Sequence, residues 1–351
     1  FSLTSMGLSL CILPMAADVG VASLWWVLAI TGFMCGPVFP AKQAMTAKWT
    51  YGGLSSYAQA VAGAGTTAGS LLALGLTSPL CARIGWRMTS VAFGYSSLLF
   101  SFVWFLSARS SPADARPLIQ HHSPPPILRS TTSTWRGAAA RWTTLLLAPP
   151  VLVIFLVHSA QVAVRTFLAQ WMPTYYMEEL HATSEIAALC LVLPEILGMF
   201  SSLLGGNIAR SLEQYGVSTL ACRRIFLTAG SMGIGLGLLS ITKLHSPVYA
   251  TCALCITNVF SNLHQIGFTS NYLDVAKSSS GLVSGVGNSL ASFASYLGAL
   301  ITSSVLTGQA DRQWGWANAC LIFAVATLLS LALYLPFASA TPIGSNHLNS
   351  A

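Results

Sequence analysis

Long apolar stretches alternate with short polar segments along most of the chain. Five stretches contain no Asp, Glu, Lys or Arg, and each can hold the helix of about 20 residues that crosses a bilayer's hydrocarbon core. Backbone polar groups within lipid must bond to one another, so only helices and closed barrels span it. The stretches lack the strict alternation of barrel strands, and the pattern therefore predicts transmembrane α-helices. They lie between Lys48 and Arg83, Arg87 and Arg109, Arg141 and Arg165, Lys243 and Asp274, and Lys277 and Asp311.

Ten spanning helices and one long polar segment follow from this pattern. The polar segment, residues 108–143, carries five arginines against one acid, which is typical of a flexible linker. It separates a predicted N-terminal part of four spans (1–107) from a C-terminal part of six spans (144–338), and a tail (339–351) follows. The spans are predicted near residues 1–16, 21–41, 56–80, 88–107, 144–169, 183–206, 225–242, 247–268, 279–306 and 315–338.

Composition supports a lipid environment. Of the 351 residues, 54% are hydrophobic and 7% are charged, whereas soluble domains carry about 25% charged residues. The net charge of +7 does not indicate a nucleic-acid partner, because most basic residues lie in short loops between spans. The eight cysteines are scattered and mostly lie in apolar runs, which argues against a disulfide framework. No nucleotide-binding, zinc-protease or hydrolase motif occurs, so we expect neither an enzyme nor a cofactor.

The distribution of basic residues orients the predicted helices. Cytoplasmic loops carry an excess of Lys and Arg. With the 108–143 linker in the cytoplasm, eleven of the 16 Lys and Arg residues fall on that side, four fall on the other side, and Arg165 lies within a span. We therefore predict a multi-pass integral membrane protein with a cytoplasmic linker.

A series of short motifs runs through the chain in a fixed order. The motifs are Gly32–Ala41 with Lys48-Trp49, Trp171–Tyr176, Gly205–Ala209 with Arg223-Arg224, Gly267–Ala276, and Gly281–Asn288. In order and spacing, the series resembles the anion:cation symporters of the major facilitator superfamily, which include sodium/phosphate cotransporters, sialin, vesicular glutamate transporters and plant anion transporters. The resemblance implies an all-α membrane bundle of two related six-helix halves, with about ten of twelve spans present and the first two missing. The alternative is a complete ten-span protein of another class.

Several positions depart from the family pattern. Cys35 stands where the family has an acidic residue in its fourth span, and Arg210 stands where the family has an aspartate. Thr50–Ser56 replaces a proline-rich turn, and the substrate-associated arginine of vesicular glutamate transporters falls at Gln161. The resemblance therefore leaves the substrate and the coupling ion open.

Arg165 is the leading candidate for substrate binding. A charge at a helix centre costs about 2.5–3.5 kcal/mol and normally faces the bundle interior or water. His158, Gln161 and Arg165 lie at i, i+3 and i+7, on one helical face. An arginine on that face can hold a carboxylate or phosphate through two parallel hydrogen bonds. The alternative is that Arg165 snorkels to the outer interface or pairs structurally with an acid.

Glu195, which directly follows Pro194 in the next span, is the candidate for ion coupling. Burial raises the proton affinity of a carboxylate, and a neighbouring cation lowers it again. If Glu195 pairs with Arg165, an arriving substrate displaces the pair and proton uptake compensates the charge. The alternative is a static ion pair that ties two spans together.

Further polar residues lie at helical spacing in two later spans. Such stripes either line a hydrated pathway or bond neighbouring helices together. Asp274 and Lys277 lie in a short loop, where they either form a gating contact or stay solvated. The predicted substrate-binding set is Arg165, Gln161, His158, Asn258, Asn262 and Asn288, with Glu195 for ion coupling and with Asp274 and Lys277 for gating or structure.

These features predict secondary active transport of a small organic anion or inorganic phosphate, driven by H⁺ or Na⁺ through alternating access. We expect a monomer in the lipid bilayer, with no metal and no nucleic-acid partner. Two alternatives stay open: a transport-inactive relative that acts as a sensor or receptor, and a non-functional truncated product.

Overall fold

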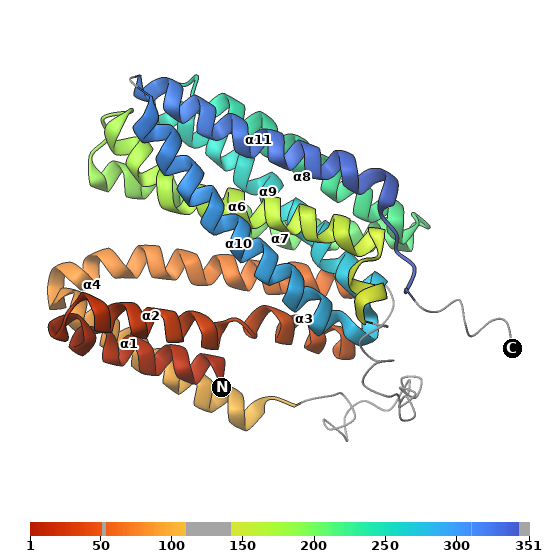
Figure 1. The fold of residues 1–351 in the computed structure, drawn as a ribbon, viewed down its shortest axis with the longest axis horizontal. Coiled ribbons are helices and arrows are strands. Elements are labelled where there is room, and N and C mark those ends of the chain that lie inside the picture. The colour runs from red at the N-terminus through yellow and green to blue at the C-terminus, as the bar shows by residue number, and fades with distance from the viewer. Residues whose placement is uncertain (51–53, 110–141, 310, 344–351) are drawn as a thin grey trace, which may run out of the picture.

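The computed structural model describes residues 1–50, 54–109, 142–309 and 311–343. This part of the chain contains helices and no strand (Figure 1). Most of the predicted linker (residues 110–141) and the last eight residues of the predicted tail lie outside the described residues.

The N-terminal half consists of α1 to α4. Between α2 and α3 the helix is interrupted at Gly36-Pro37, because a proline ring fixes φ and offers no N–H to the helix. α4 holds two candidate spans, 54–77 and 79–107. It is kinked at Gly85, whose φ of 76° is a conformation that glycine adopts readily. The bounds are α1 Ser2–Val19, α2 Val21–Cys35, α3 Val38–Trp49 and α4 Leu54–Ser107.

The C-terminal half consists of α6 to α11 and a short 3₁₀ helix, η2. Thr183, Ser218 and Asp311 precede three of these helices, and the side chain of each accepts a backbone N–H from the first turn. Several helices run beyond the predicted apolar segments into charged residues, as α6 and α7 do. The bounds are α6 Pro149–Glu178, α7 Ser184–Gln214, α8 Thr219–Ile241, α9 Pro247–Val275, η2 Lys277–Ser279, α10 Ser280–Gly308 and α11 Arg312–Phe337.

Nine helical segments of the described chain are long and apolar enough to cross a membrane, which makes this a multi-pass membrane protein. The sequence predicted ten spans. The one that is missing from these nine, near residues 247–268, is present as α9, a helix of 29 residues that is less apolar than the others. Its polar side chains, among them Asn258, Asn262 and His264, are buried. α6, α7 and α8 pack around α9, so these polar side chains do not meet lipid.

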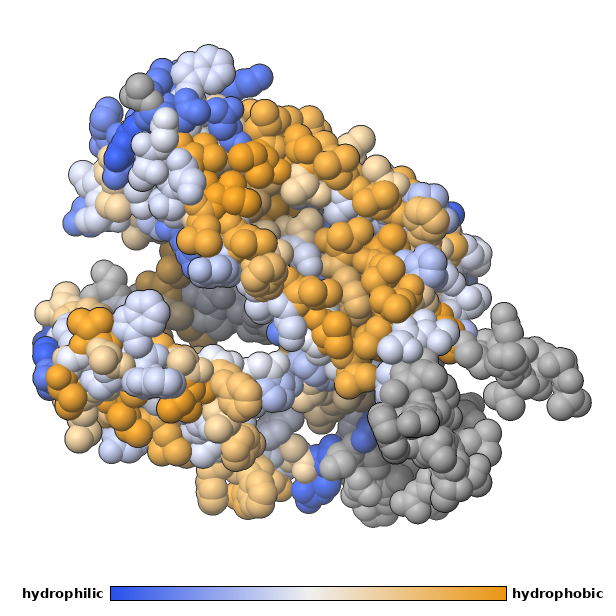
Figure 2. Space-filling model, in the orientation of Figure 1, coloured by the Kyte–Doolittle hydropathy of each residue, from blue (hydrophilic) through white to orange (hydrophobic). Residues whose placement is uncertain are grey.

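The two halves face each other and touch at one end (Figure 1). We call this the linker end, because α6 begins there after the predicted linker (Figure 1), and we call the opposite end the outer end. α3 packs against α10, and the first span of α4 packs against α7 and α9. A Cβ on Gly281 would lie 3.0 Å from the Cβ of Ala44, so glycine permits this close approach. Figure 2 shows the halves separating toward the outer end, with apolar side chains across the middle of the C-terminal half.

Candidate functional site

A cavity of about 660 Å³ lies between the two halves, toward their outer end. One wall comes from the first span of α4, and the other walls come from α6, α7 and α9. Most of the lining is Leu, Ala and Pro. The polar side chains that reach the cavity are Ser70, Thr77, Arg165, Glu195 and Asn258.

Arg165 enters this cavity from the middle of α6. It lies thirteen positions before Glu178 at the outer end of the helix, which corresponds to about 20 Å of helix. Its Nη1 donates a hydrogen bond to Oε1 of Gln265 on α9, at 2.9 Å. The guanidinium thus lies deep within the bundle, held from one side and open to the cavity.

Glu195 enters the same cavity from α7. Its Oε1 accepts a hydrogen bond from Nδ2 of Asn258 on α9, at 3.1 Å. Its Oε2 is buried and has no hydrogen-bond partner among the described residues. Burying a carboxylate oxygen without a hydrogen-bond donor costs free energy. A hydrogen bond from a ligand to this atom would therefore be favourable.

Arg165 and Glu195 line one cavity without forming an ion pair. The ion pairs within 4 Å in the described part of the chain involve other residues. The pairing considered from the sequence is therefore absent in this conformation, and both charged groups face the cavity separately.

The other predicted binding residues divide between the cavity and the helix packing. Asn258 lines the cavity, whereas Asn262 donates through Nδ2 to the backbone carbonyl of Asn258, at 2.9 Å. Gln161 is buried and donates through Nε2 to the hydroxyl and carbonyl of Ser261, at 2.6 and 2.9 Å. Gln161 thus joins α6 to α9 beside the cavity, whereas the hydrogen bonds of Asn262 stay within α9. Asn288 lies half-buried on α10, away from the cavity lining.

His158 lies in an aromatic cluster on the linker side of Arg165. Its Nδ1 and the Tyr272 hydroxyl are 3.0 Å apart, and its ring stacks on Phe268 with centroids 4.8 Å apart. Phe39 on α3 contributes from the N-terminal half, 5.0 Å from the His158 ring. This cluster brings the two halves into contact on the linker side of the cavity.

A network of charged groups joins the halves at the linker end. Arg223 on α8 is 2% exposed and donates to both carboxylate oxygens of Asp274 on α9, at 2.7 and 3.3 Å. It also donates to Glu213 on α7, at 3.0 Å, and to the Ser56 hydroxyl on α4, at 2.7 Å. Ser56 belongs to the N-terminal half, so this network ties the halves together. Lys277 is exposed and takes part in no ion pair of the described residues.

From the sequence, Arg223 was assigned to a family motif and to the basic residues on the cytoplasmic side, and no contact with the other half was predicted. Arg223 lies in the second turn of α8, beyond the first turn in which the helix dipole acts most strongly on a side chain. Its partners Glu213, Asp274 and Ser56 lie on three other helices, so no pattern along the sequence identifies the network.

Neutral hydrogen bonds extend this closure. Gln59 donates to Gln43 within the N-terminal half, and Gln43 donates through Nε2 to the Thr269 carbonyl of α9, at 3.4 Å. Ser202 on α7 donates to the Ala60 carbonyl of α4, at 2.9 Å. Contacts between the halves therefore gather at the linker end, while the cavity lies toward the outer end.

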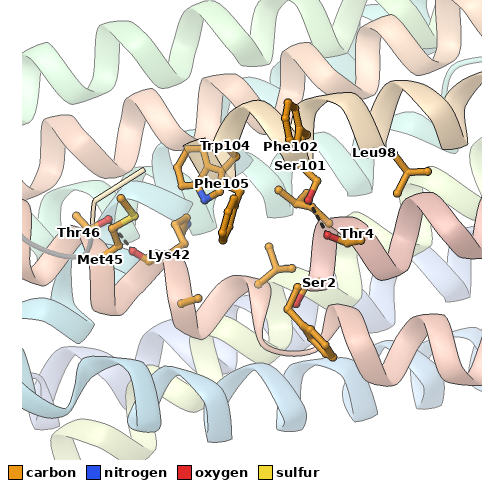
Figure 3. Close-up of a pocket in the computed structure, with 14 residues that line it drawn as sticks. Ser2, Thr4, Lys42, Met45, Thr46, Leu98, Ser101, Phe102, Trp104 and Phe105 are labelled. Atoms are coloured by element: carbon orange, nitrogen blue, oxygen red, sulfur yellow. Dashed lines mark hydrogen bonds between the residues drawn. The ribbon is translucent and has the colours of Figure 1, made fainter. Parts of the chain in front are cut away.

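A second cavity, of about 670 Å³, lies within the N-terminal half between α1, α3 and the second span of α4 (Figure 3). Phe102, Trp104 and Phe105 contribute aromatic rings to its lining. Lys42 reaches it from α3, and its Nζ lies 4.8 Å from the centroid of the Phe39 ring. None of the residues predicted for binding or coupling lines this cavity.

Two facing helical halves around a cavity define the class of fold, a major facilitator-type bundle. A family profile described as Major Facilitator Superfamily matches residues 1–299, and the chain belongs to this superfamily. The predicted fold class, the multi-pass membrane location and the assignment to a transporter family rather than to an enzyme are thereby confirmed.

Named relatives agree with the resemblance to anion:cation symporters. The chain is 26% identical over 90% of its length to "Probable anion transporter 4, chloroplastic" of Oryza sativa subsp. japonica, covering 52% of that protein. It is 27% identical over 84% of its length to "Sodium-dependent phosphate transport protein 1, chloroplastic" of Arabidopsis thaliana, covering 57% of that protein. Human sialin is 25% identical over 86% of the chain, which covers 61% of sialin. The chain thus spans between about half and three-fifths of these relatives.

Solved structures share the fold. The human organic anion transporter MFSD10 (TETRAN) matches with a TM-score of 0.70 and 16% identity, over 95% of this chain and 75% of that one. The proton:xylose symporter XylE matches with a TM-score of 0.68 and 12% identity, over 96% of this chain and 80% of that one. At these identities the likeness concerns the fold.

Proposed function

We propose that this chain belongs to a secondary active transporter of small organic anions or inorganic phosphate, which works by alternating access and is driven by an H⁺ or Na⁺ gradient. The observation that carries the proposal is Arg165, whose guanidinium faces the cavity between the halves without an acidic partner in the described chain. The names of the relatives, among them an anion transporter and a sodium-dependent phosphate transport protein, support the same substrate class.

Arg165 supplies the attraction for the anion. A guanidinium presents five N–H donors in a planar fork, and one hydrogen bond to Gln265 leaves the rest for a ligand. Gln265 holds the fork in position, so little side-chain entropy is lost when an anion binds. A charge-assisted hydrogen bond in a cavity with apolar walls is also stronger than the same bond in water.

Glu195 supplies the coupling to protons. The groups that face it are the Arg165 guanidinium from α6, the Asn258 amide from α9, and the hydroxyls of Ser70 and Thr77 from α4. Arg165 is the charged member of this set. When an anion neutralises Arg165, the Glu195 carboxylate is left as the uncompensated charge of the cavity lining, and a proton that enters with the anion balances it. Anion and proton then bind together, which is the requirement for symport.

Alternating access follows from the two ends of the bundle. In this conformation the Arg223 network, the Gln43 contact and the Ser202 contact close the linker end, and the cavity lies toward the outer end. Transport requires these contacts to break while the halves rock about the cavity. Each hydrogen bond in these contacts contributes about 0.5–3 kcal/mol. A substrate that binds one conformation more tightly than the other can offset their loss.

The test is uptake of radiolabelled anions by the full chain reconstituted into liposomes, under imposed pH or Na⁺ gradients. Arg165→Gln should abolish saturable uptake, whereas Arg210→Gln, which alters an exposed arginine of α7, should leave uptake unchanged. Glu195→Gln should remove the pH-driven component and keep anion exchange.

The outcomes separate the alternatives. Arg165-dependent binding without any flux would support a sensor or receptor and contradict transport. Equal loss of uptake in the Arg165→Gln and Arg210→Gln proteins, with both folded, would contradict the assignment of the cavity as the binding site. An Na⁺-driven flux that Glu195→Gln leaves unaltered would remove Glu195 from coupling.

A further inference from the structure

A chain of side-chain amides leads from the interior of α9 to Glu195. Nδ2 of Asn262 donates to the backbone carbonyl of Asn258, at 2.9 Å, and to the side-chain Oδ1 of Asn258, at 3.3 Å. Nδ2 of Asn258 in turn donates to Oε1 of Glu195, at 3.1 Å. Asn262 is 1% exposed and does not line the cavity, so its influence on Glu195 passes through Asn258.

The far end of this chain fixes its direction. A backbone carbonyl can only accept a hydrogen bond, so the Asn262 amide must turn its NH₂ group toward Asn258. If the Asn258 amide were rotated by half a turn, its NH₂ group would meet that of Asn262, and its oxygen would meet the carboxylate of Glu195. Both contacts would be repulsive, because donor would meet donor and acceptor would meet acceptor. Asn262 therefore selects the Asn258 rotamer that presents a donor to Glu195.

Gly198 gives the two amides their place against α7. It lies three positions after Glu195 on this helix and is buried. A Cβ on Gly198 would lie 2.6 Å from Nδ2 of Asn262 and 3.4 Å from Nδ2 of Asn258. The closer of these atoms ends a flexible side chain, so an added methyl group would displace the amides rather than the helix backbone. Glycine at this position therefore permits both amides to lie beside Glu195.

The orientation of Asn262 is unfavourable for its own side-chain oxygen. Oδ1 of Asn262 is buried and accepts no hydrogen bond from the described residues. A buried acceptor without a donor costs free energy, and an apolar side chain of similar shape avoids that cost. Packing of α9 alone therefore does not account for an asparagine here, whereas the orientation of Asn258 does.

We infer that Asn262 and Gly198 are positioning residues for Glu195, because they hold the Asn258 amide in the orientation that fixes the carboxylate at the cavity wall. This inference rests on the proposed function, in which Glu195 couples anion movement to an ion gradient. A carboxylate that loses its oriented donor samples other rotamers, and fewer molecules then carry the coupling ion together with the anion. Anion movement itself continues, since Arg165 and its bond to Gln265 are unchanged.

The test separates gradient-driven accumulation from anion exchange in liposomes that contain the full chain, with radiolabelled inorganic phosphate and radiolabelled glucuronate as probes. Asn262→Leu keeps the approximate shape of the side chain and removes its donor. We expect gradient-driven accumulation to fall about tenfold, the effect of one hydrogen bond to a charged group, and exchange to persist. Asn207→Leu is the matched control and should change neither, because Asn207 makes the same bond to the carbonyl four residues before it, at 2.9 Å, but is exposed.

Three further measurements distinguish positioning from packing. Gly198→Ala should reproduce the loss of accumulation, whereas Gly69→Ala, where a Cβ meets nothing within 4 Å, should not. Asn262→Gln keeps an amide donor and should restore part of the accumulation. In a Glu195→Gln protein, Asn262→Leu should cause no further loss, because a positioning residue acts through the group that it holds. Gly198→Ala carries the test where Asn262→Leu does not fold.

The outcomes for this inference differ from those for transport itself. Accumulation that both Asn262→Leu and Gly198→Ala leave unaltered would overturn the inference and keep Glu195 as the coupling residue. Equal losses of accumulation and exchange, together with a lower temperature of thermal unfolding, would assign Asn262 to packing and also overturn the inference. Uptake of neither probe, or accumulation that Glu195→Gln leaves intact, would contradict the proposed function on which the inference rests.

Discussion

The guanidinium of Arg223 on α8 donates a hydrogen bond of 2.7 Å to the hydroxyl of Ser56 on α4, which lies 167 residues earlier in the chain. The same guanidinium is anchored within the C-terminal half by Asp274 and Glu213. Ser56 is therefore the point at which a fixed, buried charge of one half bonds the other half. A bundle that alternates between two openings must break this bond without separating Arg223 from its acids.

Ser56→Ala should increase the fraction of molecules that open at the linker end, by about tenfold, because one hydrogen bond to a charged group is lost. Cys222 reports the opening, since it is buried in a cluster with Ala60 of the opposite half. In a protein that keeps Cys222 as its single cysteine, a membrane-impermeant maleimide should label the variant faster from the linker side. Ser97→Ala is the control, because Ser97 bonds the Leu3 carbonyl within one half. Equal labelling rates for both variants would contradict the gating role of Ser56.

Gly206→Ala should weaken closure of the linker end by steric conflict. A Cβ at this position would collide with the Cβ of Ala60 on α4, and overpacking of this kind costs about 1–3 kcal/mol. We expect faster labelling of Cys222 and slower uptake. Gly65→Ala is the matched control, since a Cβ there meets nothing within 4 Å. The prediction is wrong if the two alanine variants behave alike.

Gln265→Ala should raise the KM for the anion by about tenfold and leave the maximal uptake rate nearly unchanged. Gln265 holds the Arg165 fork through a 2.9 Å hydrogen bond, and its loss allows the arginine to sample other rotamers, which binding must then suppress. Concentration-dependent uptake measures both parameters. Gln309→Ala, at an exposed position after α10, should change neither, and an unaltered KM in Gln265→Ala would show that Arg165 needs no such support.

Tyr272→Phe should lower the free energy of unfolding by about 1 kcal/mol, because it removes the partner of a buried imidazole nitrogen. The Tyr272 hydroxyl lies 3.0 Å from Nδ1 of His158, and neither residue lines the cavity between the halves. Thermal unfolding in detergent should show the loss, while the KM stays within about twofold. Tyr249→Phe, at a residue that is 64% exposed, serves as the control. A large rise in KM at unchanged stability would instead place His158 in the binding site, as the helical spacing predicted.

Residues at membrane depth could be recognised from the sequence because the cost of placing a charge in lipid depends on its position along one helix. Arg165 and Glu195 stood out for this reason, and both face one cavity. The absence of an ion pair between them could not be predicted from the sequence. It depends on Gln265, which bonds Arg165 from 100 positions away, and on Asn258, which bonds Glu195 from 63 positions away. Gln161 shares the helical face of Arg165, yet its amide is engaged with Ser261.

The spans, their order and the family could be determined from the sequence alone, because burial of apolar side chains in lipid and satisfaction of backbone hydrogen bonds act locally along the chain. The use of each polar residue was decided only in the tertiary structure. Arg223 lies in the first turns of α8 and was counted with loop charges, but packing of four helices surrounds it with Glu213, Asp274 and Ser56. Hydrogen bonds form between neighbours in space, and the packing of helices far apart in sequence determines which donors are used and which stay free for a ligand.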